Sequence, residues 1–230
     1  MSYTPYVASQ AQVQQRTIIS QVYAWMAAGL LVTGAIALFT VNTPALLSLI
    51  FGSRLVFFGL LIGELLLVIG LSAMIGRISA SASTAIFMLY AALNGLTMAA
   101  IFLVYTRSSI ASTFFVTAGT FGAMSLYGYT TKRDLTTIGN LCVMGLIGFL
   151  LASIVNLFLH SQAIYWITTY AGIAIFVGLT AWDTQKIKRM TALGAGEEQA
   201  GRIAIAGALM LYLDFINLFL LLLRLFGRRR

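Results

Sequence analysis

Charged residues are scarce in this sequence. Only 9% of its 230 residues are Asp, Glu, Lys or Arg, whereas a soluble domain carries roughly 25%. Hydrophobic residues make up 60% of the chain, and the mean hydropathy is +0.95. Apolar stretches of about 20 residues, the length of a helix that crosses a bilayer, recur along the whole chain. The composition therefore excludes an ordinary soluble domain and predicts a polytopic membrane protein.

Proline is nearly absent as well. The two prolines, Pro5 and Pro44, lie outside the apolar stretches, so no membrane helix is expected to be kinked by proline. In lipid, only helices and closed barrels satisfy every backbone hydrogen bond, and these stretches are too long and too continuous for barrel strands. We therefore expect an all-α polytopic membrane protein.

Cysteine and histidine each occur once. Cys142 lies inside an apolar stretch, which excludes a disulfide framework and a metal-ligand cluster, and we expect it to be a small packing side chain. His160 stands at the end of a stretch, where an interfacial role is favoured over that of a base or ligand. We expect no bound cofactor. The first 20 residues are polar and rich in Gln, so no cleavable signal peptide is expected.

Seven membrane spans are expected, joined mostly by short connections. Residues 1–20 are predicted to form a polar tail that enters the first helix near Arg16, and residues 21–230 a single seven-helix membrane domain. The one longer connection, from Met190 to Arg202, is rich in glycine and charge and is a candidate hinge. The expected spans are residues 21–40, 55–75, 80–104, 109–130, 138–159, 164–187 and 203–224.

The distribution of basic residues predicts the orientation of these spans. The opposite side from the N-terminus carries only Arg54 and Arg107 in its connections. We therefore assign the net charge of +8 to topology and not to nucleic-acid binding, and expect the N-terminus in the cytoplasm. The basic residues on the side of the N-terminus are Arg16, Arg77, Lys132, Arg133, Lys186, Lys188, Arg189 and Arg202.

The C-terminal sequence RLFGRRR conflicts with this orientation, because an odd number of spans places its arginines outside. Either the tail is an exception, since late charges are weaker determinants, or the last segment re-enters the membrane and both termini face the cytoplasm. Seven full spans are the preferred interpretation.

Three acidic residues interrupt apolar stretches. Asp214 lies 11 residues past Ile203, about 16 Å into its helix, and Glu64 lies about 13 Å into its span. Asp183 lies nearer the cytoplasmic end, about 9 Å before Arg189. An ionised carboxylate in hydrocarbon costs several kcal/mol or more, so such residues usually face the interior of the bundle and carry function.

Asp183 and Asp214 are expected to approach each other, because the last two spans are consecutive and antiparallel. Two carboxylates in contact at low dielectric cannot both ionise cheaply, so the pair tends to share one proton. With that proton, the pair is a hydrogen-bonded latch between two helices; without it, the carboxylates repel each other and attract a cation. This pattern predicts a pH-sensitive gate with a transient calcium site. The alternative is that each aspartate bonds separately to polar neighbours for packing.

Three further residues are candidates for the gate or for an ion pathway. Arg77, at the cytoplasmic end of the second span, is either an ion-pair partner of Asp183 or a topology charge. Asn217 lies three residues beyond Asp214 on the same helix face, and either steadies that carboxylate or bonds a neighbouring helix. Glu64 joins Asn217 as a pathway candidate, because a midplane glutamate is costly unless it is protonated or lines water.

Three segments resemble the Bax-inhibitor family (transmembrane BAX inhibitor motif proteins). GALMLYLDFINLFLLLLRLFG, residues 207–227, is similar to the family's last helix, and FVGLTAWDTQKIKRM, residues 176–190, to its sixth helix and the basic stretch that follows. FGAMSLYGYTTKRDL, residues 121–135, is similar to the bacterial inner-membrane branch. The resemblance covers nearly the whole chain from residue 20, and the two aspartate-bearing segments are its most specific part.

This resemblance implies a seven-helix fold with the last helix at the centre, in the inner (cytoplasmic) membrane. It also implies a pH-dependent calcium leak in which Asp183 and Asp214 are the proton sensor and Arg77 is the basic residue at the end of the second helix. Glu64 has only an approximate counterpart, because its spacing to Arg77 departs from the family pattern. Bacterial members of the family have also been linked to regulating a membrane-bound protease.

Several functions compete on these features. The first is a passive cation pathway, for Ca²⁺ above all, which prefers several oxygen ligands and must be bound weakly for conduction. A proton-coupled antiporter is a variant within the same transport class. The second is an intramembrane aspartyl protease, but Asp214 is preceded by MLYL and not by the Gly-x-Gly of such enzymes, so no enzyme is expected.

The third function is a non-conducting regulator that binds a membrane protease or other membrane proteins through the polar tail and the connection 190–202. The partners expected overall are the lipid bilayer, calcium ions and protons, with no nucleic acid. The chain is expected to be a monomer or a weak oligomer.

Overall fold

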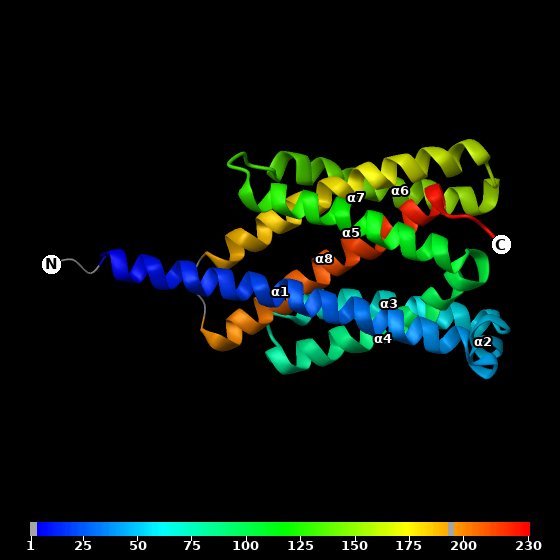
Figure 1. Ribbon diagram of the computed structural model, residues 1–230, viewed down its shortest axis with the longest axis horizontal. Coiled ribbons are helices and arrows are strands. Elements are labelled where there is room, and N and C mark those ends of the chain that lie inside the picture. The colour runs from blue at the N-terminus through cyan, green and yellow to red at the C-terminus, as the bar shows by residue number, and fades with distance from the viewer. Residues whose placement is uncertain (1–3, 193–195) are drawn as a thin grey trace. The chain divides into compact units, whose positions relative to one another are not determined.

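The computed structural model describes residues 4–192 and 196–230, and that part of the chain is almost entirely helical (Figure 1). Helix accounts for 89% of the structure. Eight α-helices follow one another within the described residues: α1 (Thr4–Val41), α2 (Pro44–Phe51), α3 (Arg54–Met74), α4 (Ala80–Val104), α5 (Arg107–Thr130), α6 (Thr136–Leu159), α7 (Gln162–Thr191) and α8 (Glu197–Phe226).

Seven of these helices are long and apolar enough to cross a membrane, and each overlaps one of the seven predicted spans. The all-α fold and the number of spans are therefore confirmed. The short helix α2 was not predicted, because eight residues are too few to give a span of apolar residues. Its boundaries do carry local cues, since Pro44 occupies its first turn and Gly52 ends it.

Two helix boundaries differ from the prediction. Helix α1 begins at Thr4, and its span at Val13, so the predicted polar tail is helical from its fourth residue instead of entering the helix near Arg16. Helix α7 continues to Thr191 and α8 begins at Glu197, which shortens the predicted hinge. Residues 1–3 of the tail and 193–195 of the hinge lie outside the described residues. Acids in the first turn of α8 and bases in the last turn of α7 favour these extensions, because they oppose the helix dipoles.

Helix α8 is the most buried of the spans. In its apolar window 78% of the residues are buried, whereas none is buried in the corresponding window of α6. Helix α8 is also continuous from Glu197 to Phe226, including the turn around Asp214. It therefore offers no break at which the chain could re-enter the membrane.

The chain forms two compact units. The first unit contains the chain up to Val104, residues Ile187–Tyr212 and Arg230; the second contains Tyr105–Lys186 and Leu213–Arg229. In the first unit α1 packs along α4, while α3 packs on α4 and the short α2 contacts both α1 and α3 (Figure 1). The second unit contains α5, α6, most of α7 and the second half of α8.

The C-terminal residues of the second unit are held against the connection between α4 and α5. The backbone N–H of Thr106 donates to the carbonyl of Arg228 (3.1 Å), and Tyr105 forms an isolated antiparallel bridge with Arg229. The Arg228 N–H donates to the Ser109 hydroxyl oxygen (2.9 Å). The end of the chain is therefore fixed at the same end of the unit as the start of α5.

With seven crossings, the two termini should lie on opposite sides of the membrane. In a Cys142→Ser background, Ser9→Cys and Arg230→Cys variants should react with a membrane-impermeant maleimide from opposite faces of the membrane. Intact spheroplasts should be labelled only at position 230 if the N-terminus is cytoplasmic, and permeabilised ones at both positions. Labelling of both variants from the same face would contradict the seven-span topology.

Candidate functional site

The structure brings together the two aspartates that the sequence analysis expected to approach each other. Asp183 on α7 and Asp214 on α8 share a side-chain hydrogen bond within the second unit. Both are buried, with 9% and 4% of their surface exposed. Ionised carboxylates are acceptors only, so a hydrogen bond between two carboxyl groups requires a proton on one of them. Two carboxyl groups in this contact are therefore candidates for a pair that shares one proton.

The surroundings of the pair are mostly apolar. A buried cluster of Phe176, Leu179, Leu218, Leu221 and Leu222 continues along the same two helices. The Oδ2 atom of Asp214 is buried and has no hydrogen-bond partner among residues 4–192 and 196–230.

Lys186 lies one turn further along α7 from Asp183 and acts on it electrostatically. The Lys186 ammonium itself lies 5.1 Å from the centre of the Trp182 ring. The pair thus has one cation beside Asp183 and apolar packing around Asp214.

Two glycines allow neighbouring helices to approach α7 next to Asp183. A Cβ atom on Gly128 of α5 would lie 2.1 Å from the carbonyl oxygen of Ala181, closer than real contacts allow. A Cβ on Gly139 of α6 would lie 2.2 Å from the ring of Trp182. Membrane helices associate closely through such small residues. The turn of α7 that precedes Asp183 is therefore fixed between α5 and α6.

Gly128→Ala should lower the stability of the protein, because the new methyl group meets backbone atoms that cannot rotate away. Overpacking of this kind typically costs about 1–3 kcal/mol. Gly122→Ala on the same helix is the matched control, since nothing lies within 4 Å of its added Cβ. Thermal unfolding in detergent should show a lower midpoint for Gly128→Ala alone, and equal midpoints would mean that α5 does not pack on α7 as described.

Polar side chains beside Asp183 also tie α7 to its neighbours. Gln185 accepts a hydrogen bond from the N–H of Leu135 (2.9 Å) and donates one to the carbonyl of Arg133 (2.8 Å), which holds the connection between α5 and α6. The Thr184 hydroxyl lies 3.3 Å from that of Ser125 on α5. These residues were not identified from the sequence, where Thr and Gln beside an aspartate carry no distinctive pattern.

Asn217 does not hydrogen-bond to Asp214 in this arrangement. Its side-chain amide donates to the carbonyl of Leu213 in its own helix (2.8 Å), so neither the steadying of the carboxylate nor a bond to another helix is seen. Asn217 instead lines a cavity together with Arg224. Its place in an ion pathway stays a prediction.

Glu64 belongs to the first unit, where it is 7% exposed and fully hydrogen-bonded. Its two oxygens accept from the Thr97 hydroxyl (2.9 Å) and the Asn94 amide (3.2 Å). The Asn94 carbonyl oxygen accepts from the Tyr212 hydroxyl (3.2 Å), which lies 2.7 Å from the hydroxyl of Thr33. Neutral donors from α4 therefore satisfy this midplane carboxylate, and the network links α1, α3, α4 and α8.

Arg77 lies exposed in the connection between α3 and α4, in the first unit, whereas the aspartate pair lies in the second. Its pairing with Asp183 therefore stays a prediction.

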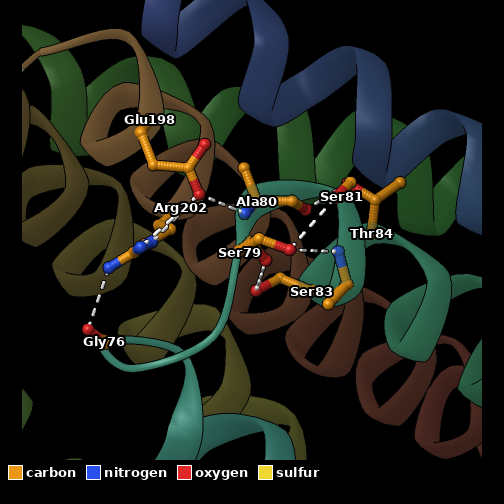
Figure 2. Close-up of polar contacts among 9 residues, drawn as sticks. Gly76, Ser79, Ala80, Ser81, Ser83, Thr84, Glu198 and Arg202 are labelled. Atoms are coloured by element: carbon orange, nitrogen blue, oxygen red, sulfur yellow. Dashed lines mark hydrogen bonds and ion pairs between the residues drawn. The ribbon is translucent and has the colours of Figure 1, made fainter.

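The same connection is held by the start of α8 (Figure 2). Arg202 donates to the carbonyl of Gly76 (2.9 Å), and Glu198 accepts from the N–H of Ala80 (2.7 Å). The two side chains also form an ion pair, with 3.4 Å between Arg202 Nε and Glu198 Oε1. The first turns of α8 thus satisfy backbone groups at the end of α3 and the start of α4.

Comparison with known proteins extends the similarity to nearly the whole chain. The sequence model of the family described as "Inhibitor of apoptosis-promoting Bax1" matches residues 15–230. The chain is 55% identical to "Inner membrane protein YbhL" of Escherichia coli over 222 residues, which cover 94% of this chain and 93% of that protein. It is 42% identical to a protein of Borreliella burgdorferi, over 92% of each chain, and 41% identical to one of Deinococcus radiodurans, over 94% and 92%. This chain therefore belongs to the Bax inhibitor family of membrane proteins.

Proposed function

We propose that this protein is a pH-regulated passive leak channel for cations, Ca²⁺ above all, in the inner membrane, and that Asp183 and Asp214 form its proton-sensing gate. The observation that carries the proposal is the hydrogen bond between these two buried carboxyl groups on consecutive membrane helices. An intramembrane carboxylate that faces the protein interior is by default a candidate for a proton or ion site.

The gate works through one proton. In this gate Asp214, the more deeply buried of the two carboxyl groups, carries the proton, and Lys186 lies one turn along α7 from Asp183. When the proton leaves, two like charges remain in contact. At 4 Å and an effective dielectric constant near 20, two unit charges repel each other by about 4 kcal/mol. That energy is large enough to change the separation of the side chains on α7 and α8.

The deprotonated pair attracts a cation but holds it weakly. Ca²⁺ takes six to eight oxygen ligands, as calcium sites generally do, and two carboxylates offer at most four. Within the described residues no group of three or more His, Cys, Asp or Glu side chains could hold a metal ion. A transient site of this kind suits conduction, which requires an ion to leave as readily as it enters. The continuity of α8 through Asp214 weighs against a protease that would use the same pair.

Calcium flux into liposomes tests the proposal directly. The purified protein is reconstituted with a calcium-sensitive dye inside, and the flux is followed from about pH 5 to about pH 8, a range that brackets pairs of coupled carboxyl groups. Flux above that of empty liposomes, with a pH dependence that Asp183→Asn and Asp214→Asn both remove, is the expected result. No flux at any pH would reject the channel and favour a non-conducting regulator of other membrane proteins.

An imposed proton gradient separates a leak from an antiporter. In a passive leak, the rate at which Ca²⁺ moves depends on the pH at the gate but not on the direction of the proton gradient. Reversal of net Ca²⁺ movement on reversal of the gradient would instead assign the protein to proton-coupled exchange.

A further inference from the structure

A cavity of about 400 Å³ lies in the second unit, and its lining includes neither aspartate of the pair. It is lined by Tyr105 at the end where the C-terminal residues are held, by Phe149 and Ser153 of α6, and on α8 by Asn217, Leu220, Leu221, Leu223 and Arg224. Asn217 and Arg224 are seven residues apart, so the cavity extends about 10 Å along α8 from its C-terminal end.

The outer end of this cavity is positively charged. Arg224 lies 4.3 Å from the centre of the Tyr165 ring and 3.4 Å from the hydroxyl of Thr169, and in the described part of the chain it pairs with no carboxylate. Arg229 donates to the hydroxyl of the same Tyr165 (3.2 Å). The chain's six acidic residues are Glu64, Asp134, Asp183, Glu197, Glu198 and Asp214. None of them lies in the connections at the end of the second unit where the C-terminal residues are held. Because the arginines there have no acidic neighbour in the sequence of these connections, an anion is the complementary ligand.

Two neutral polar side chains, Ser153 and Asn217, also line the cavity. The hydroxyl oxygen of Ser153 is buried and has no hydrogen bond to any residue that the structure describes. Asn217 uses one N–H for the carbonyl of Leu213 and keeps its oxygen and second N–H for other partners. The other lining residues of α6 and α8 are apolar: Phe149, Leu220, Leu221 and Leu223. The cavity thus offers a cation near the C-terminal end of α8, together with neutral donors and apolar walls.

The helix on one side of the cavity faces lipid. In the apolar window of α6 no residue is buried, and Leu150, Leu157 and Phe158 are 51%, 71% and 80% exposed. A cavity that borders such a helix adjoins the bilayer, and its donors can be satisfied by molecules that reside there.

From these features we infer that the cavity binds one anionic phospholipid from the leaflet at the C-terminal end of α8. The phosphate lies against the guanidinium of Arg224, the ester oxygens accept from Ser153 and Asn217, and an acyl chain follows Phe149 and Leu221. A guanidinium matches phosphate geometry with paired N–H donors. A free phosphate ion would satisfy Arg224 but leave Ser153 without a partner, and a cation would meet no acid in the cavity.

Native mass spectrometry of the full-length protein in detergent tests this inference. Phosphatidylglycerol is titrated onto the wild type, Arg224→Gln, Ser153→Leu and the control Arg228→Gln, which removes one exposed arginine of the tail outside the cavity lining. Arg224→Gln should weaken binding about tenfold or more, the size typical of a lost charged hydrogen bond. Ser153→Leu should weaken it by replacing a hydroxyl donor of the lining with a larger apolar side chain, and Arg228→Gln should bind as the wild type does.

Further titrations separate the sources of the phosphate group. Phosphatidylethanolamine should bind the wild type more weakly than phosphatidylglycerol, and equal affinities would overturn the preference for an anionic lipid. Inorganic phosphate should not displace the bound lipid at matched concentration; displacement would assign the cavity to a free anion. If Arg224→Gln does not fold, Ser153→Leu decides, and unchanged binding in that variant overturns the inference. None of these readouts depends on calcium flux.

Discussion

Asp214→Asn should make calcium flux independent of pH, and hold it at the value that the wild type shows when its aspartate pair is protonated. The side-chain amide is nearly the same size as a protonated carboxyl group and can donate the hydrogen bond that Asp183 accepts, but it has no proton to lose. The two-charge state is then never formed. From about pH 5 to about pH 8, a range that brackets coupled carboxyl pairs, the ratio of fluxes at the two ends should fall to about one.

Asp134→Asn is the matched control for this experiment. It makes the same chemical change in an exposed residue of the connection between α5 and α6, where Asp134 accepts from the backbone and hydroxyl of Thr136. Its flux should keep the wild-type dependence on pH. If Asp214→Asn still responds to pH as the wild type does, the titrating group lies elsewhere and the gate assignment is wrong.

The positions of the seven spans along the chain could be predicted, because they depend on local composition alone. Runs of apolar residues long enough to cross a bilayer are visible without any knowledge of neighbours, and each predicted span overlaps a helix of the structure. Where the chain is polar, this pattern is lost. The helical start of α1 from Thr4 and the extension of α8 back to Glu197 depend on helix propensity and terminal charges, which are weaker cues.

The approach of Asp183 to Asp214 could be predicted from two considerations. One is the free-energy cost of placing a carboxylate in hydrocarbon, and the other is that the two aspartates lie on consecutive helices. A carboxylate in hydrocarbon needs a partner, and two such residues on consecutive antiparallel helices have each other within reach. What surrounds the pair could not be predicted, because it depends on how each helix is rotated about its axis. Gly128 and Gln185 illustrate the difference: each makes a specific contact beside Asp183, yet neither residue type marks a contact in the sequence.

Glu64 shows that the free-energy cost of a carboxylate in the membrane does not by itself assign a functional role to that residue. The same argument that pointed to the aspartates pointed to Glu64, but its oxygens accept from Thr97 and Asn94 on the neighbouring helix α4. A buried carboxylate that accepts hydrogen bonds from neutral donors can stabilise helix packing or bind an ion. Only the positions of the donors distinguish these two roles.

Asn94→Leu should be among the most destabilising substitutions in the first unit. It removes the donor to one oxygen of Glu64 and the acceptor of the Tyr212 hydroxyl, both in the buried network. A neutral hydrogen bond between membrane helices averages only about 0.6 kcal/mol, but a buried partner left unpaired costs about 1–3 kcal/mol, and more if it is charged. We expect a loss of about 2–4 kcal/mol in the free energy of unfolding, measured in mixed detergent micelles.

Two further variants identify the cause of that loss. Asn217→Leu makes the same change in a residue whose hydrogen bond stays within its own helix, and should cost less than about 1 kcal/mol. The double variant Glu64→Leu with Asn94→Leu should be more stable than Asn94→Leu alone, because replacing both partners leaves no unpaired carboxylate. If the two losses simply add, Asn94 does not hold Glu64, and Glu64 returns to the ion pathway as an unsatisfied acid.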